Sequence, residues 1–290
     1  MNNYKGIVYA LLSSVAFGIM PILARVAYIN GSNPTTVLVF RFIISTLVLF
    51  LYLKYIKIEI SLKKEQIFLL LINTIGYTIT TLALFISYNY LGAGLATTLH
   101  FIYPVVVCIV GFIFFKNKMS TRKIISLLLA ATGIYLLAAF KNSTINVLGI
   151  SLALFSGVAY GFTMIGLNLK PIRNLDNRVV TMYICFGSSI GTALYGLLNN
   201  SITLNFNFKA VICYLGISVI STIVSIILLL KATKIIGVSS SAILGTFEPI
   251  VSIFLGVLFL GERLSIVLLI GSVFILISTV ILAKDRYEHS

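Results

Sequence analysis

Three ionisable side chains, Arg41, His100 and Glu248, lie within long apolar stretches of the chain. A charge in the hydrocarbon core of a membrane costs at least ~2.5–3.5 kcal/mol at a helix centre, so such residues usually face a bundle interior or a water-filled cavity. An acid there can hold a cation or a proton, and an arginine can bind a carboxylate or phosphate through two parallel hydrogen bonds. These three residues are therefore candidates for a substrate site inside the membrane.

Glu248 is the most informative of the three, and two interpretations of it are open. In the first, a protonated or hydrogen-bonded acid holds neighbouring helices together. In the second, the acid faces a cavity and binds substrate or a proton. A carboxyl group changes its proton affinity when its surroundings alternate between dry and wet. The position therefore suits proton coupling, although one glutamate is not proof of it.

Arg41 and His100 also have a structural and a functional interpretation. Arg41 can pair with backbone carbonyls or lipid head groups near a helix end. Alternatively, it can bind an anionic group of the substrate or pair with Glu248 between transport steps. His100 is either a buried, hydrogen-bonded side chain or a ligand for substrate or protons, since an unperturbed imidazole titrates close to neutral pH.

Aromatic side chains supply the apolar part of this predicted site. The chain has 15 Tyr, 20 Phe and no Trp, and ordinary helix packing explains most of them. Tyr77, Tyr103 and Tyr160 lie within apolar stretches and are the candidates for lining a cavity. An aromatic cavity with one acid favours an amphipathic metabolite or an organic cation, held partly by cation–π contact.

Ten apolar stretches could carry these residues across a bilayer, which takes about 20 residues per helix. Of the 290 residues, 59% are hydrophobic and 10% charged, against roughly 25% charged in soluble domains. We therefore expect an all-α integral membrane protein with ten transmembrane helices. They are expected at Gly6–Tyr28, Pro34–Leu53, Gln66–Tyr88, Ala93–Phe115, Thr121–Ala139, Val147–Leu169, Asn177–Leu198, Phe208–Leu230, Ser239–Leu260 and Leu264–Ala283.

The chain is also one unit written twice. Gly6–Gly18 recurs as Gly149–Gly161, with eight of 13 positions identical, and a second echo links Gly92–Ser120 to Gly237–Ser265. Self-similarity at a fixed offset indicates repeated structure. Each unit holds five spans, an odd number, so the second copy must enter the membrane upside down, as in many transporters. The two inverted five-helix repeats are expected over residues 5–140 and 147–284.

Small residues and prolines recur at equivalent places in the two repeats. Small residues spaced by four positions let helix backbones approach closely, and prolines remove a backbone hydrogen bond. Pro104 and Pro249 are expected to kink their helices, either as tolerated bends or as bends that open a midplane cavity. The residues expected to pack helices are Ser14, Gly18, Gly157 and Gly161.

The formal net charge of +14 follows membrane topology and does not indicate a nucleic-acid partner. With both termini in the cytoplasm, sixteen Lys and Arg residues fall in cytoplasmic segments and three in the opposite loops. That excess is the positive-inside pattern, and such residues orient helices and contact anionic membrane lipid. We expect a multi-pass protein of a bacterial cell (plasma) membrane with cytoplasmic N- and C-termini.

Enzyme and metal-site motifs do not occur in the sequence. There is no HExxH, Walker A or paired-aspartate motif, and Asp176 and Asp285 are expected outside the bilayer core. Cys108, Cys185 and Cys213 show no CxxC spacing and are expected to pack as small hydrophobes. We therefore expect no catalytic residues, cofactor or metal, and transport driven by a gradient instead of ATP.

Several of these segments together resemble the EamA family of the drug/metabolite transporter superfamily, over nearly the whole chain. The resemblance rests on the SSVAFG and SGVAYG pair, on Arg41-Phe42, on Pro104 in an Ala-rich stretch, and on Glu248-Pro249 followed by LGERLS. It implies a ten-helix inverted-repeat carrier that works by alternating access, usually as an exporter of amino acids or other metabolites. The family is functionally diverse, so the resemblance implies no particular substrate.

The predicted function is secondary active transport of small organic metabolites such as amino acids or amines, with export as the expected direction. Protons are the candidate coupling ion, and the sequence leaves the oligomeric state open. The first alternative is a passive channel for small solutes, which would lack a saturable, side-alternating site. The second is an integral-membrane enzyme that modifies lipid, against which the scarcity of acidic residues argues.

Overall fold

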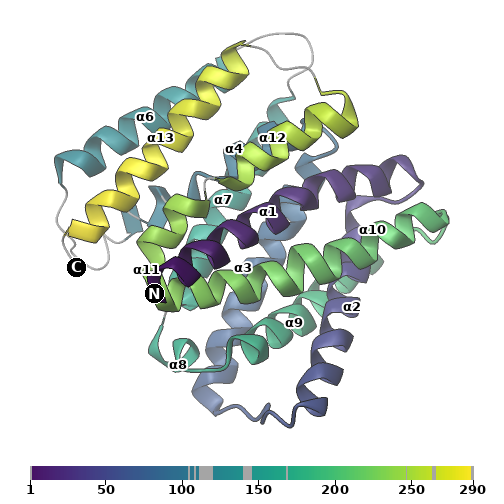
Figure 1. Ribbon diagram of the computed structural model, residues 1–290. Helices are drawn as coiled ribbons and strands as arrows, with labels where there is room; N and C mark the ends of the chain where they lie inside the picture. The colour runs from purple at the N-terminus through teal and green to yellow at the C-terminus, as the bar shows by residue number, and fades with distance from the viewer. Residues whose placement is uncertain are drawn as a thin grey trace.

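The computed structural model describes residues 2–103, 105–107, 109–110, 120–139, 146–167, 169–245, 247–262 and 266–288. These residues form helices and no strand (Figure 1). In chain order the elements are α1 (Asn2–Ile29), α2 (Pro34–Tyr55), α3 (Lys64–Ser87), α4 (Ala93–His100), α6 (Thr121–Ala139), α7 (Val147–Leu167), α8 (Lys170–Arg173), α9 (Asn177–Leu198), α10 (Phe208–Ser218), the π-helix η1 (Val219–Val224), α11 (Ser225–Gly245), α12 (Phe247–Leu260) and α13 (Ile266–Glu288).

Six helices among the described residues are long and apolar enough to cross a membrane. They lie at Tyr4–Ile29, Pro34–Tyr55, Lys64–Ser87, Val147–Leu167, Asn177–Leu198 and Phe208–Ile236. The all-helical membrane architecture expected from the sequence is therefore confirmed. The other four expected spans coincide with α4, α6, α12 and α13, whose apolar described segments are shorter, so the number ten stays a prediction.

Side chains at the helix ends explain where several helices begin. Asn33 accepts a hydrogen bond from Thr36 N at 2.8 Å, and Pro34 follows as the first residue of α2. Asn207 likewise accepts from Lys209 N at 3.0 Å at the start of α10. Asparagine caps satisfy amide groups that have no partner within the helix, and proline has no amide hydrogen to lose there.

Two helices break where the sequence predicted continuous spans. Helix α4 ends at His100, and a turn precedes Tyr103, whereas α11 ends at Gly245 and α12 begins at Phe247. His100 and Gly245 are 145 residues apart, which is the offset of the second sequence echo. In both repeats the residue four positions later is a proline, which has no N–H for the carbonyl of the preceding turn. The two repeats therefore break at equivalent points.

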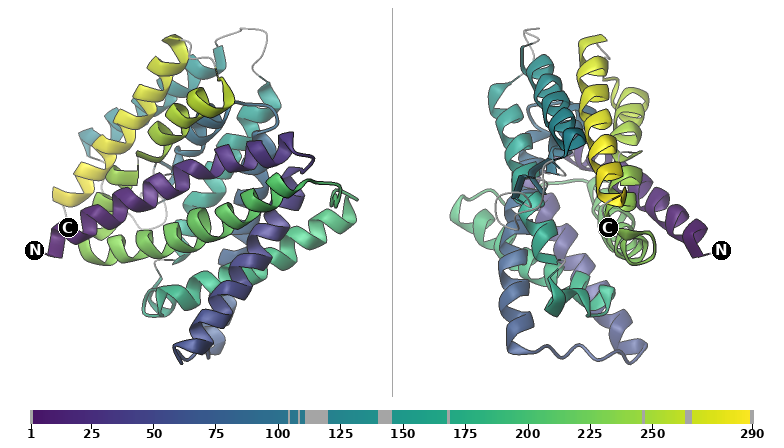
Figure 2. Two further views of the ribbon diagram at one scale, coloured as in Figure 1. Left: turned by 45° about the vertical axis from the view of Figure 1, so that its right-hand side comes forward. Right: turned by 90° about the vertical axis from the view of Figure 1, so that its left-hand side faces the viewer.

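The main helix contacts between the two repeats each have a counterpart in which the equivalent helices of the repeats are swapped. Helix α1 packs along α11 and α12, whereas α7 packs along α3 and α4. Helix α2 pairs with α9, and α6 pairs with α13, which lie side by side at one edge of the bundle (Figure 2). The helices of each repeat thus pack mainly against helices of the other repeat. Both termini lie on the same side of the molecule (Figures 1 and 2).

The small residues of α1 lie against the break between α11 and α12. Ser14 Oγ donates to the carbonyl oxygen of Leu244 at 3.0 Å. A Cβ atom added to Gly18 would lie 2.7 Å from Val251 Cβ and 2.9 Å from the carbonyl oxygen of Glu248. Only a glycine therefore lets α1 approach the backbone of α12 this closely.

The small residues of α7 make the equivalent contacts in the other repeat. A Cβ atom on Gly157 would lie 2.5 Å from the carbonyl oxygen of His100, and one on Gly161 would lie 3.2 Å from that of Tyr103. These two carbonyl oxygens are backbone atoms, which cannot rotate away as a side chain can. Both faces of small residues thus support the two helix breaks.

Substituting Gly157 with alanine is expected to destabilise the protein by about 1–3 kcal/mol, the usual cost of overpacking. Thermal unfolding of the detergent-solubilised protein measures the effect as a lower Tm. The matched control is Gly216→Ala, where the added atom meets only the end of the flexible Leu23 side chain, with Cδ1 at 3.0 Å and Cδ2 at 4.0 Å. Equal Tm values for the two variants would show that the close approach at Gly157 is not needed.

Candidate functional site

All six residues predicted to bind substrate line one central cavity. They come from α2, α3, α4, α7, α12 and the segment after α4: Arg41, Tyr77, His100, Tyr103, Tyr160 and Glu248. The cavity volume is about 130 Å³, below the roughly 300–1,000 Å³ of sites for drug-sized ligands. The cavity therefore suits a small solute, and both repeats contribute to it.

Arg41 is fully buried, at 0% exposure, and is held by hydroxyl groups and rings. Its Nε donates to Thr222 Oγ1 at 2.7 Å and its Nη2 donates to Tyr77 OH at 3.1 Å. Its Cζ lies 4.9 Å from the ring centroid of Phe42 and 5.4 Å from that of Phe85. Among the described residues, Nη1 has no hydrogen-bond partner. The Nη1 amino group of this buried cation is thus unpaired within the described part of the chain, and Arg41 lies at the wall of the central cavity.

A π-helix positions one of the Arg41 partners. Thr222 lies in η1, and its Oγ1 donates to the carbonyl oxygen of Ile217 at 2.9 Å, so it accepts the hydrogen bond from Arg41 Nε. The other partner, Tyr77, lies 145 residues earlier, the same separation as between Tyr103 and Glu248. π-Helical turns often occur at functional sites. Arg41 therefore donates hydrogen bonds to one element of each repeat, α3 and η1.

Glu248 lies in the first turn of α12 and is half-buried at the cavity wall. The N-terminus of a helix favours a carboxylate there, because free amide groups and the helix dipole are positive at that end. No basic side chain described by the structure forms an ion pair with it, and Arg41 makes its contacts elsewhere. The pairing of Arg41 with Glu248 that the sequence left open is not formed in this conformation.

Pro249 follows Glu248 in the same first turn and is buried. A proline is well tolerated at that position, because the amide it lacks would have no partner within the helix. Its equivalent, Pro104, and the cysteine Cys108 lie outside the described residues. The kinking role of the two prolines stays a prediction.

His100 and two tyrosines form an aromatic wall. Ser156 Oγ donates to the carbonyl oxygen of Ala153 at 2.6 Å, so it accepts from His100 Nδ1 at 2.8 Å. The His100 ring centroid lies 5.2 Å from that of Tyr160, and Tyr103 packs edge-on against Tyr160 at 4.9 Å. The wall presents ring faces and hydroxyl groups, which suit an amphipathic or cationic solute.

Sequence reasoning missed the hydroxyl groups of α3 and α1 that also line the cavity. These hydroxyl groups belong to Thr80 and Thr81 of α3, which follow Ile79, and to Ser13 of α1, which precedes Ser14. Thr80 Oγ1 is buried and, within the described part of the chain, lacks a hydrogen-bond partner. The clustering of threonines in one apolar span was the available signal.

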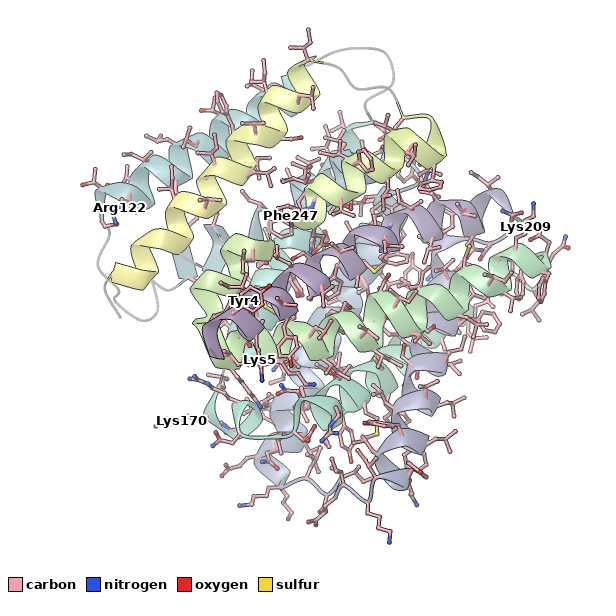
Figure 3. The ribbon with its side chains drawn as sticks, in the orientation of Figure 1. Tyr4, Lys5, Arg122, Lys170, Lys209 and Phe247 are labelled. Carbon is pink, nitrogen blue, oxygen red and sulfur yellow. The ribbon has the colours of Figure 1, made fainter. Side chains whose placement is uncertain are left out.

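The cavity reaches from the centre to the end of the bundle that carries α8. Arg173, Asn177 and Lys234 line it there. Figure 3 shows Lys170 of α8 and Lys5 of α1 at this end, with Lys209 at the opposite side. The part of the cavity that leads to the central residues is therefore lined by basic side chains.

Comparisons with known proteins agree with this architecture. A family model described as the EamA-like transporter family matches residues 4–139 and 147–284. The "Uncharacterized transporter YcbK" of Bacillus subtilis is 25% identical over 280 residues, covering 92% of this chain and 88% of that protein. The "Uncharacterized inner membrane transporter YicL" of Salmonella typhimurium is 24% identical over 300 residues, covering 100% and 98%. A structure titled "Crystal structure of protein" shares the fold, with a TM-score of 0.70, 12% identity and 99% of both chains covered.

Proposed function

The chain belongs to the EamA-like transporter family, and from this premise we propose that it is a secondary active exporter of small organic metabolites such as amino acids or amines. Family membership makes it a multi-pass membrane transporter and not an enzyme. The observation that carries the finer proposal is the central cavity, where the Nη1 of Arg41 and the carboxylate of Glu248 have no partner of opposite charge among the described residues.

This pair of groups suits a small solute that carries both charges, or one positive charge. Arg41 can donate to a carboxylate, and Glu248 can accept from an ammonium group. Tyr103 and Tyr160 provide ring faces to the cation beside them. A neutral sugar would use none of these charges, so amino acids and amines are the better candidates.

Alternating access is the proposed mechanism, with a rocking motion centred on the two helix breaks. The breaks after His100 and Gly245 are equivalent in the two repeats, and discontinuous helices border the substrate site in other transporters. We propose that residues 5–140 and 147–284 form the two inverted repeats of ten spans. The basic end would face the cytoplasm, with both termini, and Glu248 would exchange a proton when the cavity changes sides.

Counterflow in proteoliposomes tests this proposal. Vesicles containing the purified protein and a high concentration of one unlabelled amino acid or amine are diluted into a trace of the labelled compound. A carrier accumulates the label transiently and saturates with concentration. Label that only equilibrates, without saturation, would indicate a channel, and no movement of any solute under any imposed pH gradient would reject transport of this class. Dependence of net flux on the pH gradient tests the proton.

A further inference from the structure

A second cavity opens on the flank of the bundle, at its basic end, between α2, the start of α9 and the continuous η1–α11 helix. Its volume is about 580 Å³, within the roughly 300–1,000 Å³ of ligand sites. It shares Asn177 and Lys234 with the central cavity. The two cavities therefore adjoin, and neither the site described above nor transport of a small solute accounts for the flank cavity.

One wall of the flank cavity is apolar and opens outward. Val48 and Leu49 of α2 line it together with Ile223 of η1 and Ile227 of α11, and all but Val48 belong to one hydrophobic cluster. Leu49 is buried, whereas Val48 is 41% exposed and Tyr52, one turn further along α2, is 46% exposed. Exposed apolar residues on a transmembrane helix face lipid, so this wall is accessible to an acyl chain from the membrane.

The rim of the flank cavity, formed by its charged lining residues, carries net positive charge. Arg178 donates to Asp176 through both Nε (2.9 Å) and Nη2 (2.7 Å), and these hydrogen bonds hold the pKa of Asp176 below its ordinary value. That pair therefore adds no net charge. The net positive charge comes from the other two basic residues of the cavity, Lys231 and Lys234, which lie one turn apart on α11.

Lys234 also interacts with the carboxylate of Asp176, but that carboxylate is already paired with Arg178, so the Asp176, Arg178, Lys231 and Lys234 side chains of the cavity carry a net positive charge. Lys231 Nζ lies 5.7 Å from the ring centroid of Tyr9, and Lys234 Nζ donates to the carbonyl oxygen of Leu175 at 3.4 Å. These contacts orient the two ammonium groups and leave the rim with its net positive charge. A doubly positive rim beside an apolar wall complements an amphiphile with an anionic head.

We propose that the flank cavity binds an anionic phospholipid, with its phosphate on Lys231 and Lys234 and an acyl chain along Val48, Ile223 and Ile227. Basic pockets between helices at the cytoplasmic leaflet bind anionic head groups by this chemistry. The apolar wall distinguishes a lipid from a free phosphate ion, which would use only the rim. The bound lipid lies beside the mouth of the central cavity, at Lys234 and Asn177.

Native mass spectrometry of the full-length protein in neutral detergent tests this site. The protein is titrated separately with phosphatidylglycerol, phosphatidylcholine and inorganic phosphate. We expect retention of phosphatidylglycerol in preference to the other two. The double variant Lys231→Gln/Lys234→Gln is expected to weaken it about 30-fold, from ~1 kcal/mol for each lysine at the membrane surface and tenfold per 1.4 kcal/mol.

Two further variants separate this site from general charge attraction. Lys57→Gln/Lys64→Gln removes the same charge from exposed positions outside the cavity and is expected to retain phosphatidylglycerol as the wild type does. Val48→Trp fills the apolar wall and is expected to weaken lipid binding while both lysines remain. Equal loss in the two double variants, equal retention of phosphatidylcholine, or undiminished binding by Val48→Trp would each overturn the proposal. None of these readouts depends on the transported solute.

Discussion

Replacing Glu248 with glutamine is expected to lower the rate of substrate export by at least about 30-fold, without loss of the folded protein. In the proposed mechanism Glu248 forms its charge pair with an ammonium group of the bound substrate; removing one partner of such a pair costs roughly 2–5 kcal/mol, and each 1.4 kcal/mol is a factor of ten. Glutamine keeps the shape of the side chain at the start of α12 but can neither balance an ammonium group nor release a proton. Export rates in proteoliposomes, with and without an imposed pH gradient, measure the effect.

Glu65→Gln is the matched control, because Glu65 also lies in the first turn of a helix, α3, but is exposed and outside the cavity. It should transport at the wild-type rate. Thermal shifts with amino acids and amines add a binding readout that is independent of flux. A compound that stabilises the wild type and Glu248→Gln equally would remove Glu248 from the binding site.

Replacing Arg41 with lysine is expected to impair transport of amino acids far more than transport of amines that lack a carboxylate. Lysine keeps the positive charge but loses the planar fork that reaches Thr222, Tyr77 and a ligand at once. We expect about a 100-fold loss in the export rate of an amino acid, and a loss of less than about tenfold for its decarboxylated amine.

The amine serves as an internal control for folding, since both substrates are measured on the same preparation. Unequal losses would place the substrate carboxylate at Arg41. Equal losses for the two compounds would mean that Arg41 holds α2 against η1 and α3 without binding substrate. That outcome would leave the counterflow test of transport itself unaffected.

The composition of the candidate site was largely predictable from the sequence. A charge or histidine in an apolar span is costly unless it faces a polar interior, so Arg41, His100 and Glu248 stood out. All three line one cavity with Tyr77, Tyr103 and Tyr160. The hydroxyl groups of Thr80 and Thr222 were missed, because a threonine costs little in an apolar helix; only the clustering of threonines in α3 hinted at Thr80.

The helix breaks lie close to the two prolines that the sequence singled out. Pro104 and Pro249 follow His100 and Gly245 by four residues, and helices α4 and α11 end at His100 and Gly245. The sequence reasoning expected a kink within continuous helices. It did not anticipate that Glu248 would begin a new helix, where amide groups and the dipole favour its carboxylate.

The sequence by itself determined the helical membrane class, the family, the duplicated unit and the candidate residues. Those features depend on local properties: run length, apolar content, proline chemistry and the cost of burying a charge. Only the tertiary structure decided that Arg41 binds Thr222, 181 residues away, and makes no pair with Glu248. It also decided that Lys231, Val48 and Ile223 share a cavity. These contacts join segments far apart in the chain, so they depend on how each repeat packs against the other.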